Sequence, residues 1–294
     1  MNPPVKPQLD TQKPITRKAL ELMLCNEGFV DIVQGRIDSG KLPYRIVILE
    51  DGKPILEDTL NPGELHLAKF ITVDPSTLVL KDKSKKASKT THEVLIVGAT
   101  GTGKEIIARS MIADRPGSFR AINCAGLPEG LIESILFGHI KGSFTGAYTD
   151  KEGFIADAKD GVMFLDEIGE MPMLMQAKLL RTIQEKKINK VGSTKDEDIN
   201  CKFVFATNKD LEKMVGEGKF REDLYARIST LELNIKPLTE RLCDAVPICK
   251  SLVGGDKFLE TYQDSLSSGL LDLRHNVRSI QRLVIRHSVW GSIN

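Results

Sequence analysis

The sequence has almost no excess of charge: among its 294 residues, 41 Lys and Arg stand against 40 Asp and Glu, which gives a formal net charge of +1. A molecule-wide field that would attract nucleic acid or an anionic membrane is therefore not expected. The five cysteines include no CxxC pair, and the five histidines show no metal-ligand spacing. These absences argue against a disulfide framework and a zinc site, and they favour a reducing compartment.

Long apolar runs are also missing. No stretch approaches the roughly 20 residues that a transmembrane helix needs. The polar, proline-rich start, MNPPVKPQLDTQKP, does not resemble a signal peptide. We therefore expect a cytoplasmic protein with no membrane partner. The length predicts about two domains, which are large enough to bury a core without disulfides.

Residues 1–70 predict a small α+β segment of unknown role. Apolar residues recur at helical spacing over 15–33, and YRIVILEDGKPILEDTL (44–60) predicts a strand, an Asp51-Gly52 turn and a second strand. The stretch KDKSKKASKT (81–90) contains five lysines. It is more typical of a solvated linker or the exposed face of a short helix than of a nucleic-acid patch.

From residue 93 onward, buried strands alternate with helices. The predicted strands are EVLIV (93–97), GVMFLDE (161–167) and KFVFATN (202–208), and the clearest predicted helices are KEIIARSMIA and MPMLMQAKLLRTIQE. This alternation predicts an α/β fold with a parallel sheet covered by helices on both faces. The second helix has a core-facing stripe made of Met171, Leu174, Met175, Leu179, Leu180 and Ile183.

A glycine-rich loop follows the first of these strands and leads into a helix, which is the context of a phosphate-binding loop. Its residues are Gly98, Ala99, Thr100, Gly101, Thr102, Gly103, Lys104 and Glu105. The glycines let backbone N–H groups point at phosphate oxygens, and Lys104 can reach the β- and γ-phosphates of ATP. Glu105 stands where Ser or Thr would offer a hydroxyl to Mg²⁺.

Paired acids end the second strand. Asp166 is the candidate Mg²⁺ residue, and Glu167 is the candidate for polarising the attacking water. Without a phosphate loop, an Asp-Glu pair would more often reflect the charge preference of a helix N-terminus. Asn208 ends the third strand and can place its amide beside the γ-phosphate or the water.

Two arginines in KFREDLYAR, Arg221 and Arg227, are candidates for stabilising the transition state from a neighbouring subunit. The simpler interpretation is exposed helix charge, and the catalytic one requires an oligomer. The stretch FGHIKGSFTGAYTD places a phenylalanine between Gly142 and Gly146. By itself it fits an ordinary turn whose aromatic ring returns to the core.

From Glu93 to Arg241 the sequence resembles the AAA+ domains of bacterial sigma-54-dependent transcription activators. The shared motifs include GxxGTGKE, in which that family also carries Glu after the lysine, and INCAGLPEGLIESILFGH, KGSFTGA, GVMFLDEIGEMP, QAKLLRTIQE, FVFATNKDL, GKFREDLYARI and PLTER. The resemblance implies a P-loop AAA+ ATPase domain in residues 71–240 and a helical lid in 241–294. It also implies ATP and Mg²⁺ as cofactors and a homo-oligomeric ring, with six subunits expected and seven left open.

The resemblance also implies roles for individual residues. A GAFTGA loop contacts sigma-54 within promoter-bound RNA polymerase in that family, and here the loop is Gly142, Ser143, Phe144, Thr145, Gly146 and Ala147. Asn123 would pair with Glu167 and couple the nucleotide state to the loop. Arg278, in LRHNVRSIQRL, would be the second sensor arginine, although the Trp, Pro and Gly of the family's lid motif are missing.

Two further departures leave alternatives open. The sequence stops at Asn294 without an evident DNA-binding helix-turn-helix, and residues 1–70 lack the acidic cluster of a receiver domain. The main hypothesis is an ATPase that remodels sigma-54 RNA polymerase. A non-activating module that binds sigma-54 or an activator ring remains an alternative, as does a AAA+ motor that acts on another protein.

Overall fold

The computed structural model describes residues 44–48, 54–58 and 62–293. The chain divides into two compact units, Met1–Asn61 and Pro62–Asn294. In the first, β1 (Tyr44–Ile48) and β2 (Pro54–Asp58) pair antiparallel, with Tyr44 opposite Asp58. The two predicted strands are confirmed, whereas the predicted turn at Asp51-Gly52 and the predicted helix over 15–33 lie outside the described residues.

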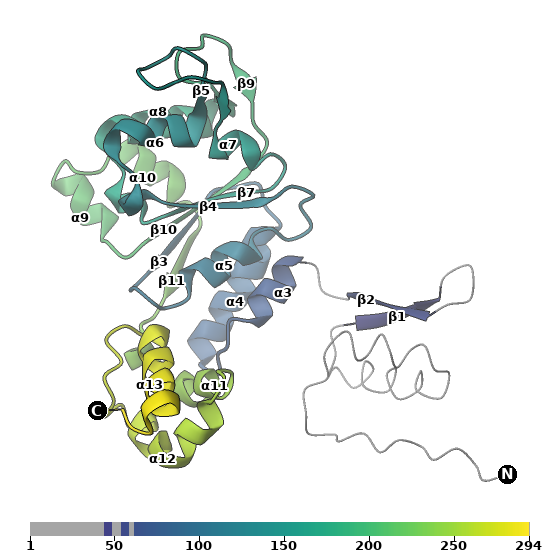
Figure 1. The fold of residues 1–294 in the computed structure, drawn as a ribbon, viewed down its shortest axis with the longest axis vertical. Coiled ribbons are helices and arrows are strands. Elements are labelled where there is room, and N and C mark those ends of the chain that lie inside the picture. Colours follow the sequence, from purple (N-terminus) through teal and green to yellow (C-terminus); the bar gives the residue numbers. More distant parts are fainter. Residues whose placement is uncertain (1–43, 49–53, 59–61, 294) are drawn as a thin grey trace. The chain divides into compact units, whose positions relative to one another are not determined.

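A five-stranded parallel sheet forms the centre of the second unit (Figure 1). In spatial order its strands are β11 (Glu232–Ile235), β3 (Val94–Gly98), β10 (Lys202–Thr207), β7 (Val162–Asp166) and β4 (Phe119–Asn123). The three central strands are the ones that the sequence predicts, and the α/β fold class is confirmed. The two edge strands were not predicted, because β4 is mostly half-buried or exposed and β11 has only four residues.

Helices cover both faces of this sheet (Figure 1). One layer contains α6 (Glu129–Phe137), α8 (Met173–Glu185), α9 (Leu211–Gly216) and α10 (Glu222–Ile228). The other contains α3 (Pro62–Ala68), α4 (Pro75–Ser88) and α5 (Lys104–Ser110). Successive strand residues alternate between the two cores: Leu95 and Phe205 belong to the first, Ile96 and Val204 to the second. This alternation explains the nearly continuous apolar runs of the central strands.

The predicted stripe on α8 is correct at five of its six positions. Met171, just before the helix, and Met175, Leu179, Leu180 and Ile183 are all buried. Leu174 is 80% exposed, so its assignment to the core is wrong. At about 100° per residue it lies on the side of the helix that also carries the exposed Arg181.

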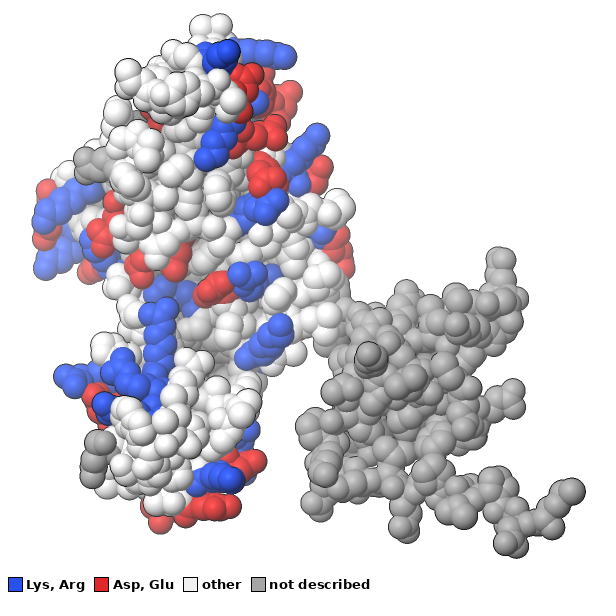
Figure 2. Space-filling model, viewed as in Figure 1, with Lys and Arg blue, Asp and Glu red and all other residues white. Residues whose placement is uncertain are grey.

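The lysine-rich stretch belongs largely to α4. Pro75 occupies the first turn, and the N-cap Asp74 accepts a hydrogen bond from Thr77 N at 2.8 Å. The helix continues to Ser88, so the short-helix interpretation of residues 81–90 holds over most of its length. Figure 2 shows basic and acidic side chains interspersed over the visible face of the described residues, in keeping with the balanced composition.

A helical subdomain follows the sheet. It consists of α11 (Ala245–Lys250), α12 (Gly255–Ser267) and α13 (Val277–Trp290), which enclose a third core around Phe258, Leu266, Ile280 and Val284. Smaller elements lie between α6 and β10: α7 (Phe154–Asp157), the β5–β6 pair (Gly138–His139, Lys151–Glu152) and the β8–β9 pair (Lys187–Ile188, Glu197–Asp198). Within the described ranges, no helix is both long and apolar enough to cross a membrane.

Candidate functional site

The glycine-rich loop lies between β3 and α5, as the sequence predicts. Gly101 and Gly103 have φ angles of 79° and 105°, which favour glycine. A Cβ on Gly103 would lie 2.8 Å from the Phe70 ring, and one on Gly101 would lie 2.3 Å from the carbonyl oxygen of His275. The loop therefore needs glycine both for its backbone conformation and for its close contacts.

Lys104 begins α5 and is 8% exposed. Its Nζ donates to the carbonyl oxygens of Gly98 at 2.8 Å and Ala99 at 3.4 Å. Burial lowers the pKa of Lys104, and the carboxylates of Glu167 and Asp166 oppose that shift. The ammonium group is thus held inside the loop and attracted by the acids at the end of β7.

The remaining loop side chains are less central. Thr102 Oγ1 donates to the carbonyl oxygen of Ala99 at 2.8 Å, which tightens the turn. Glu105 pairs with Arg109 one helical turn later, at 2.7 Å, and both side chains are largely exposed. Glu105 is thus exposed at the start of α5 and also lines the neighbouring cavity, and its assignment to the nucleotide site stays a prediction.

The acids and Asn208 come together at the carboxyl ends of β7 and β10. Asp166 Oδ1 accepts from the backbone N of Glu167 at 3.0 Å, and Glu167 is left-handed with φ 52°. Glu167 Oε2 accepts from Asn208 N at 3.4 Å, while Asn208 Nδ2 donates to Thr100 Oγ1 at 3.2 Å. Asn208 thus connects the phosphate-loop segment, through its side-chain amide, with the acid at the end of β7, through its backbone N–H.

Asn123 lies at the end of β4, directly opposite Asp166 in the strand register. Its Oδ1 accepts from Ala125 N at 2.9 Å and caps the short helix η2 (Cys124–Gly126). Asn123 and Glu167 line the same cavity, but the hydrogen bonds of the described residues do not include one between their side chains. The implied Asn123–Glu167 pair stays a prediction.

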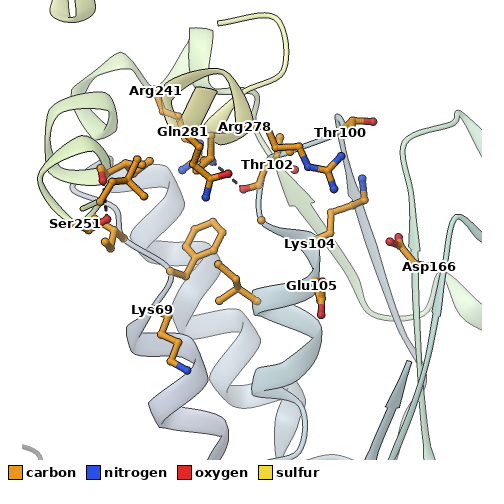
Figure 3. A pocket seen from close by; sticks show the side chains of 18 of the residues that line it. Lys69, Thr100, Thr102, Lys104, Glu105, Asp166, Arg241, Ser251, Arg278 and Gln281 are labelled. Carbon is orange, nitrogen blue, oxygen red and sulfur yellow. Dashed lines mark hydrogen bonds between the residues drawn. The ribbon is translucent and has the colours of Figure 1, made fainter. Parts of the chain in front are cut away.

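A cavity of about 490 Å³ is lined by Lys104, Asn123, Asp166 and Glu167, whereas Asn208 is not among the described residues that line it. Figure 3 shows that Lys104, Asp166 and Arg278 reach it from α5, β7 and α13. Its lining also includes the apolar side chains of Phe70, Ile71, Ile248 and Leu252, together with the polar Ser251 and Gln281. A lining that combines a lysine, an arginine and acids with apolar side chains fits a nucleotide whose phosphates and base need these two environments.

The helical subdomain is attached directly to the glycine-rich loop. Asn276 is buried with φ 55°, and its Nδ2 donates to the carbonyl oxygen of Thr100 at 2.9 Å. The next residue, Val277, donates from its backbone N to the carbonyl oxygen of Gly101 at 3.1 Å. These contacts place Arg278 at the rim of the cavity, as the sensor assignment requires.

Arg241 is a site residue that the sequence reasoning missed. It is 2% exposed, its Nη2 donates to the carbonyl oxygen of Thr102 at 3.1 Å, and its Nη1 pairs with Asp244 at 2.9 Å. Its guanidinium also lies 5.4 Å from the centre of the Phe70 ring. The only available signal was its position in PLTER, which gives no indication of these long-range partners.

The two candidate arginines, Arg221 at the N-cap of α10 and Arg227 in its last turn, lie elsewhere. Arg221 forms a two-point pair with Asp223, with distances of 3.0 and 2.7 Å, and Arg227 Nη2 lies 3.4 Å from Glu93 Oε2. In the part of the chain that the structure describes, neither side chain lines the cavity. A single chain therefore does not bring these arginines to its own site.

The GSFTGA loop lies between β5 and β6 and is closed by its own backbone. Gly142 N donates to the carbonyl oxygen of Ala147 at 2.8 Å, and Ala147 N donates to that of Phe144 at 3.0 Å. Phe144 is 37% exposed, and its ring lies edge-on to His139 at 5.0 Å between ring centres. Thr145 is exposed. The aromatic ring therefore rests on the base of the loop and is not buried in the core.

Ser143, the one change from the family's loop pattern, is poorly accommodated in this conformation. Within the described residues, its buried Oγ finds no hydrogen-bond partner. We expect Ser143→Ala to increase the free energy of unfolding by about 1 kcal/mol, because an unsatisfied hydroxyl is removed. Urea unfolding would measure this, with Thr145→Ala as the control that removes an exposed hydroxyl from the same loop. A loss of stability in Ser143→Ala beyond that of the control would contradict the expectation.

The chain is similar to known proteins in sequence. A family model described as the sigma-54 interaction domain matches residues 70–234. The sigma54-dependent transcriptional activator SfnR of Pseudomonas putida is 41% identical over 223 residues, covering 75% of this chain and 58% of the relative. The transcriptional regulatory protein GlrR of Escherichia coli K12 is 46% identical over 178 residues, covering 60% and 40% respectively.

The solved structures that resemble the chain support the fold. NtrX from Brucella abortus in complex with ADP superposes with a TM-score of 0.63 at 24% identity, covering 78% of this chain and 52% of that one. This likeness shows the fold alone. The chain spans between 40 and 58% of the length of these two curated relatives.

Proposed function

Because the chain belongs to the sigma-54 interaction domain family, we propose that it is a AAA+ ATPase that engages sigma-54 RNA polymerase through its GSFTGA loop and remodels it to activate transcription. The observation that carries this proposal is the arrangement of Lys104, Glu167 and Arg278 around one cavity. An exposed Phe144-Thr145 pair outside that cavity supplies a surface for a protein partner.

In this proposal each residue at the cavity has a role in ATP hydrolysis. Lys104 and the backbone N–H groups of the glycine-rich loop hold the phosphates, and Arg278 contacts them from the lid. Glu167 accepts the proton of the attacking water, and Asn208 orients that water beside Thr100. A change in the contacts of Glu167 is passed through Asn123 to the GSFTGA loop.

Asp166 fits Mg²⁺ bound with a nucleotide. Among the described residues, no three His, Cys, Asp or Glu side chains are placed to hold a metal ion by themselves. Mg²⁺ in nucleotide sites is commonly held by one or two carboxylates together with water and phosphate oxygens. A single carboxylate at the end of β7 matches that requirement, and Mg²⁺ would neutralise phosphate charge when bound.

A short covalent path joins the cavity to the loop. Asn123 ends β4 and caps η2, and α6 starts three residues after η2 and leads directly into β5. The loop follows at 142–147. A small change at Asn123 would therefore be passed on through a rigid helix to the base of the loop.

The proposal also divides the chain into working parts. Residues 71–240 would bind and hydrolyse ATP and contact sigma-54, residues 241–294 would act as the lid, and residues 1–70 have no assigned role. Arg221 and Arg227 would act on the ATP of a neighbouring subunit, which requires a homo-oligomeric ring, with a hexamer expected.

The experiment that tests the proposal as an enzyme is ATP turnover measured over a range of protein concentrations. Turnover per subunit should increase with concentration, because the arginines of one subunit complete the site of another. Turnover that is absent at every concentration would favour the alternative of a non-activating module that binds sigma-54 or an activator ring. Turnover without sigma-54 binding would favour a motor that acts on another protein.

A further inference from the structure

A buried carboxylate lies at the amino end of β3, the end of that strand opposite the glycine-rich loop. Glu93 immediately precedes β3, whose other end leads into the glycine-rich loop, and its side chain is 3% exposed. Its Oε1 lies 3.0 Å from Lys186 Nζ, and its Oε2 lies 3.4 Å from Arg227 Nη2. Because a buried carboxylate is costly unless it is paired, these two cations fix the side chain of Glu93.

The backbone that leads to Glu93 is also held firmly. Lys202 Nζ, which is buried, donates to the carbonyl oxygens of His92 at 2.6 Å, Thr90 at 3.0 Å and Ala87 at 3.1 Å. Arg115 donates to the carbonyl oxygen of Thr90 at 2.7 Å and to that of Ser88 at 2.9 Å. Glu93 is therefore a fixed point in the subunit.

The two arginines of α10 differ in what holds them. Arg221 is paired in two-point fashion with Asp223, two residues away on the same surface. Arg227, in the last turn of α10, is 42% exposed and contacts the buried Glu93 through one terminal nitrogen. Since a guanidinium carries five N–H donors, this contact leaves others available for a phosphate.

The charge around Arg227 is also suited to an anion. Glu93 lowers the positive charge beside the guanidinium, but Lys186 on its other oxygen restores it. The group of Glu93, Lys186 and Arg227 therefore keeps a net charge of +1. The carboxylate can orient the arginine without cancelling its attraction for phosphate.

We propose that Glu93 is the positioning residue for Arg227, holding its guanidinium in the orientation in which it completes the ATP site of the neighbouring subunit. This inference rests on the proposed function, in which Arg227 acts across a subunit interface. It extends that function by naming the residue that orients the guanidinium of Arg227 before the ring assembles.

The test is Glu93→Gln, which keeps the shape of the side chain and removes its charge. Binding of a fluorescent ATP analogue, which reports on the variant's own site, should change less than about twofold. Turnover should decrease about 10- to 100-fold, because a small misplacement of a catalytic group has effects of that size. Mixing Glu93→Gln with Lys104→Ala subunits should restore part of the turnover. The Glu93→Gln subunit keeps a complete nucleotide site, and the Lys104→Ala subunit supplies it with a correctly positioned arginine.

A second measurement separates positioning from a general structural role. Added to Arg227→Ala, Glu93→Gln should cause no further loss of turnover, because both changes remove the same contribution. A multiplicative loss would overturn the inference. Glu185→Gln, which removes the exposed partner of Arg181 by the same kind of substitution, is the matched control and should change turnover much less than Glu93→Gln.

The remaining outcomes are also decisive. Normal or increased turnover in Glu93→Gln, or no recovery on mixing, would overturn the inference while leaving the proposed ATPase intact. Absence of turnover in the unaltered protein would instead contradict the proposed function, and this inference with it.

Discussion

Glu167→Gln is expected to bind ATP with unchanged affinity and to lose turnover by at least about 10²-fold, the usual contribution of a general base. Glu167 follows β7 in a left-handed conformation and accepts from Asn208 N at 3.4 Å, so its carboxylate has a defined position at the cavity. Glutamine keeps this shape and an acceptor oxygen. Its neutral amide cannot take a proton from water.

Two measurements on Glu167→Gln decide the assignment: equilibrium binding of ATP and single-turnover hydrolysis. Lys104→Ala is the control, because removing the ammonium group that would hold the phosphates should abolish binding as well as turnover. Near-normal hydrolysis in Glu167→Gln would show that another group activates the water. Loss of ATP binding in that variant would mean that Glu167 supports the site and does not act as a base.

Asp244→Asn is expected to lower the free energy of unfolding by about 3–5 kcal/mol, the cost of leaving one member of a buried ion pair without its partner. Asp244 is fully buried and pairs with Arg241 at 2.9 Å. It also accepts from Val73 N at 2.6 Å and from Thr72 Oγ1 at 2.8 Å. Since Arg241 holds Thr102 of the glycine-rich loop, weaker ATP binding should accompany the loss of stability.

Asp272→Asn is the matched control for this prediction. Asp272 also pairs with an arginine close in sequence, Arg274, at 2.8 Å, but this pair is exposed. Its loss should change the free energy of unfolding far less than the loss of the buried pair, because water screens and replaces the interaction. Urea unfolding of both variants gives the comparison. Equal, small effects would show that the Arg241–Asp244 pair does not connect the loop and the lid as described.

The parts of the site that the sequence predicts are those encoded by local pattern. The residues of the glycine-rich loop, the acids at the end of β7 and Asn208 follow continuous apolar strands, so their meeting at one edge of a parallel sheet could be expected. Arg241 and Glu93 were missed because their importance depends on partners far away in the chain, at Thr102 and Arg227 respectively. The spacing of residues along the sequence does not indicate such long-range contacts.

The fold shows the same limit. The central strands β3, β10 and β7 are buried on both faces, so each is a continuous apolar segment that can be recognised in the sequence. The edge strands β4 and β11 contain polar or exposed residues, and they form by pairing with the neighbouring strand. Leu174 is the reverse case, an apolar residue that a periodic pattern places in the core although it is exposed. The sequence predicted the strands that are buried on both faces. It was misleading or silent where burial depends on neighbouring elements.

The most direct test of the central claim is the capture of sigma-54 by the purified protein, measured by native gel shift with and without ADP–aluminium fluoride. We predict a complex only with this transition-state analogue, and its loss in Phe144→Ala, because in the proposed function the partly exposed ring of Phe144 makes the contact. Tyr148→Ala, which removes an 83% exposed aromatic ring next to the loop, should retain the complex. A complex that forms equally without nucleotide, or that survives Phe144→Ala, would contradict the proposal that ATP hydrolysis acts on sigma-54 through this loop.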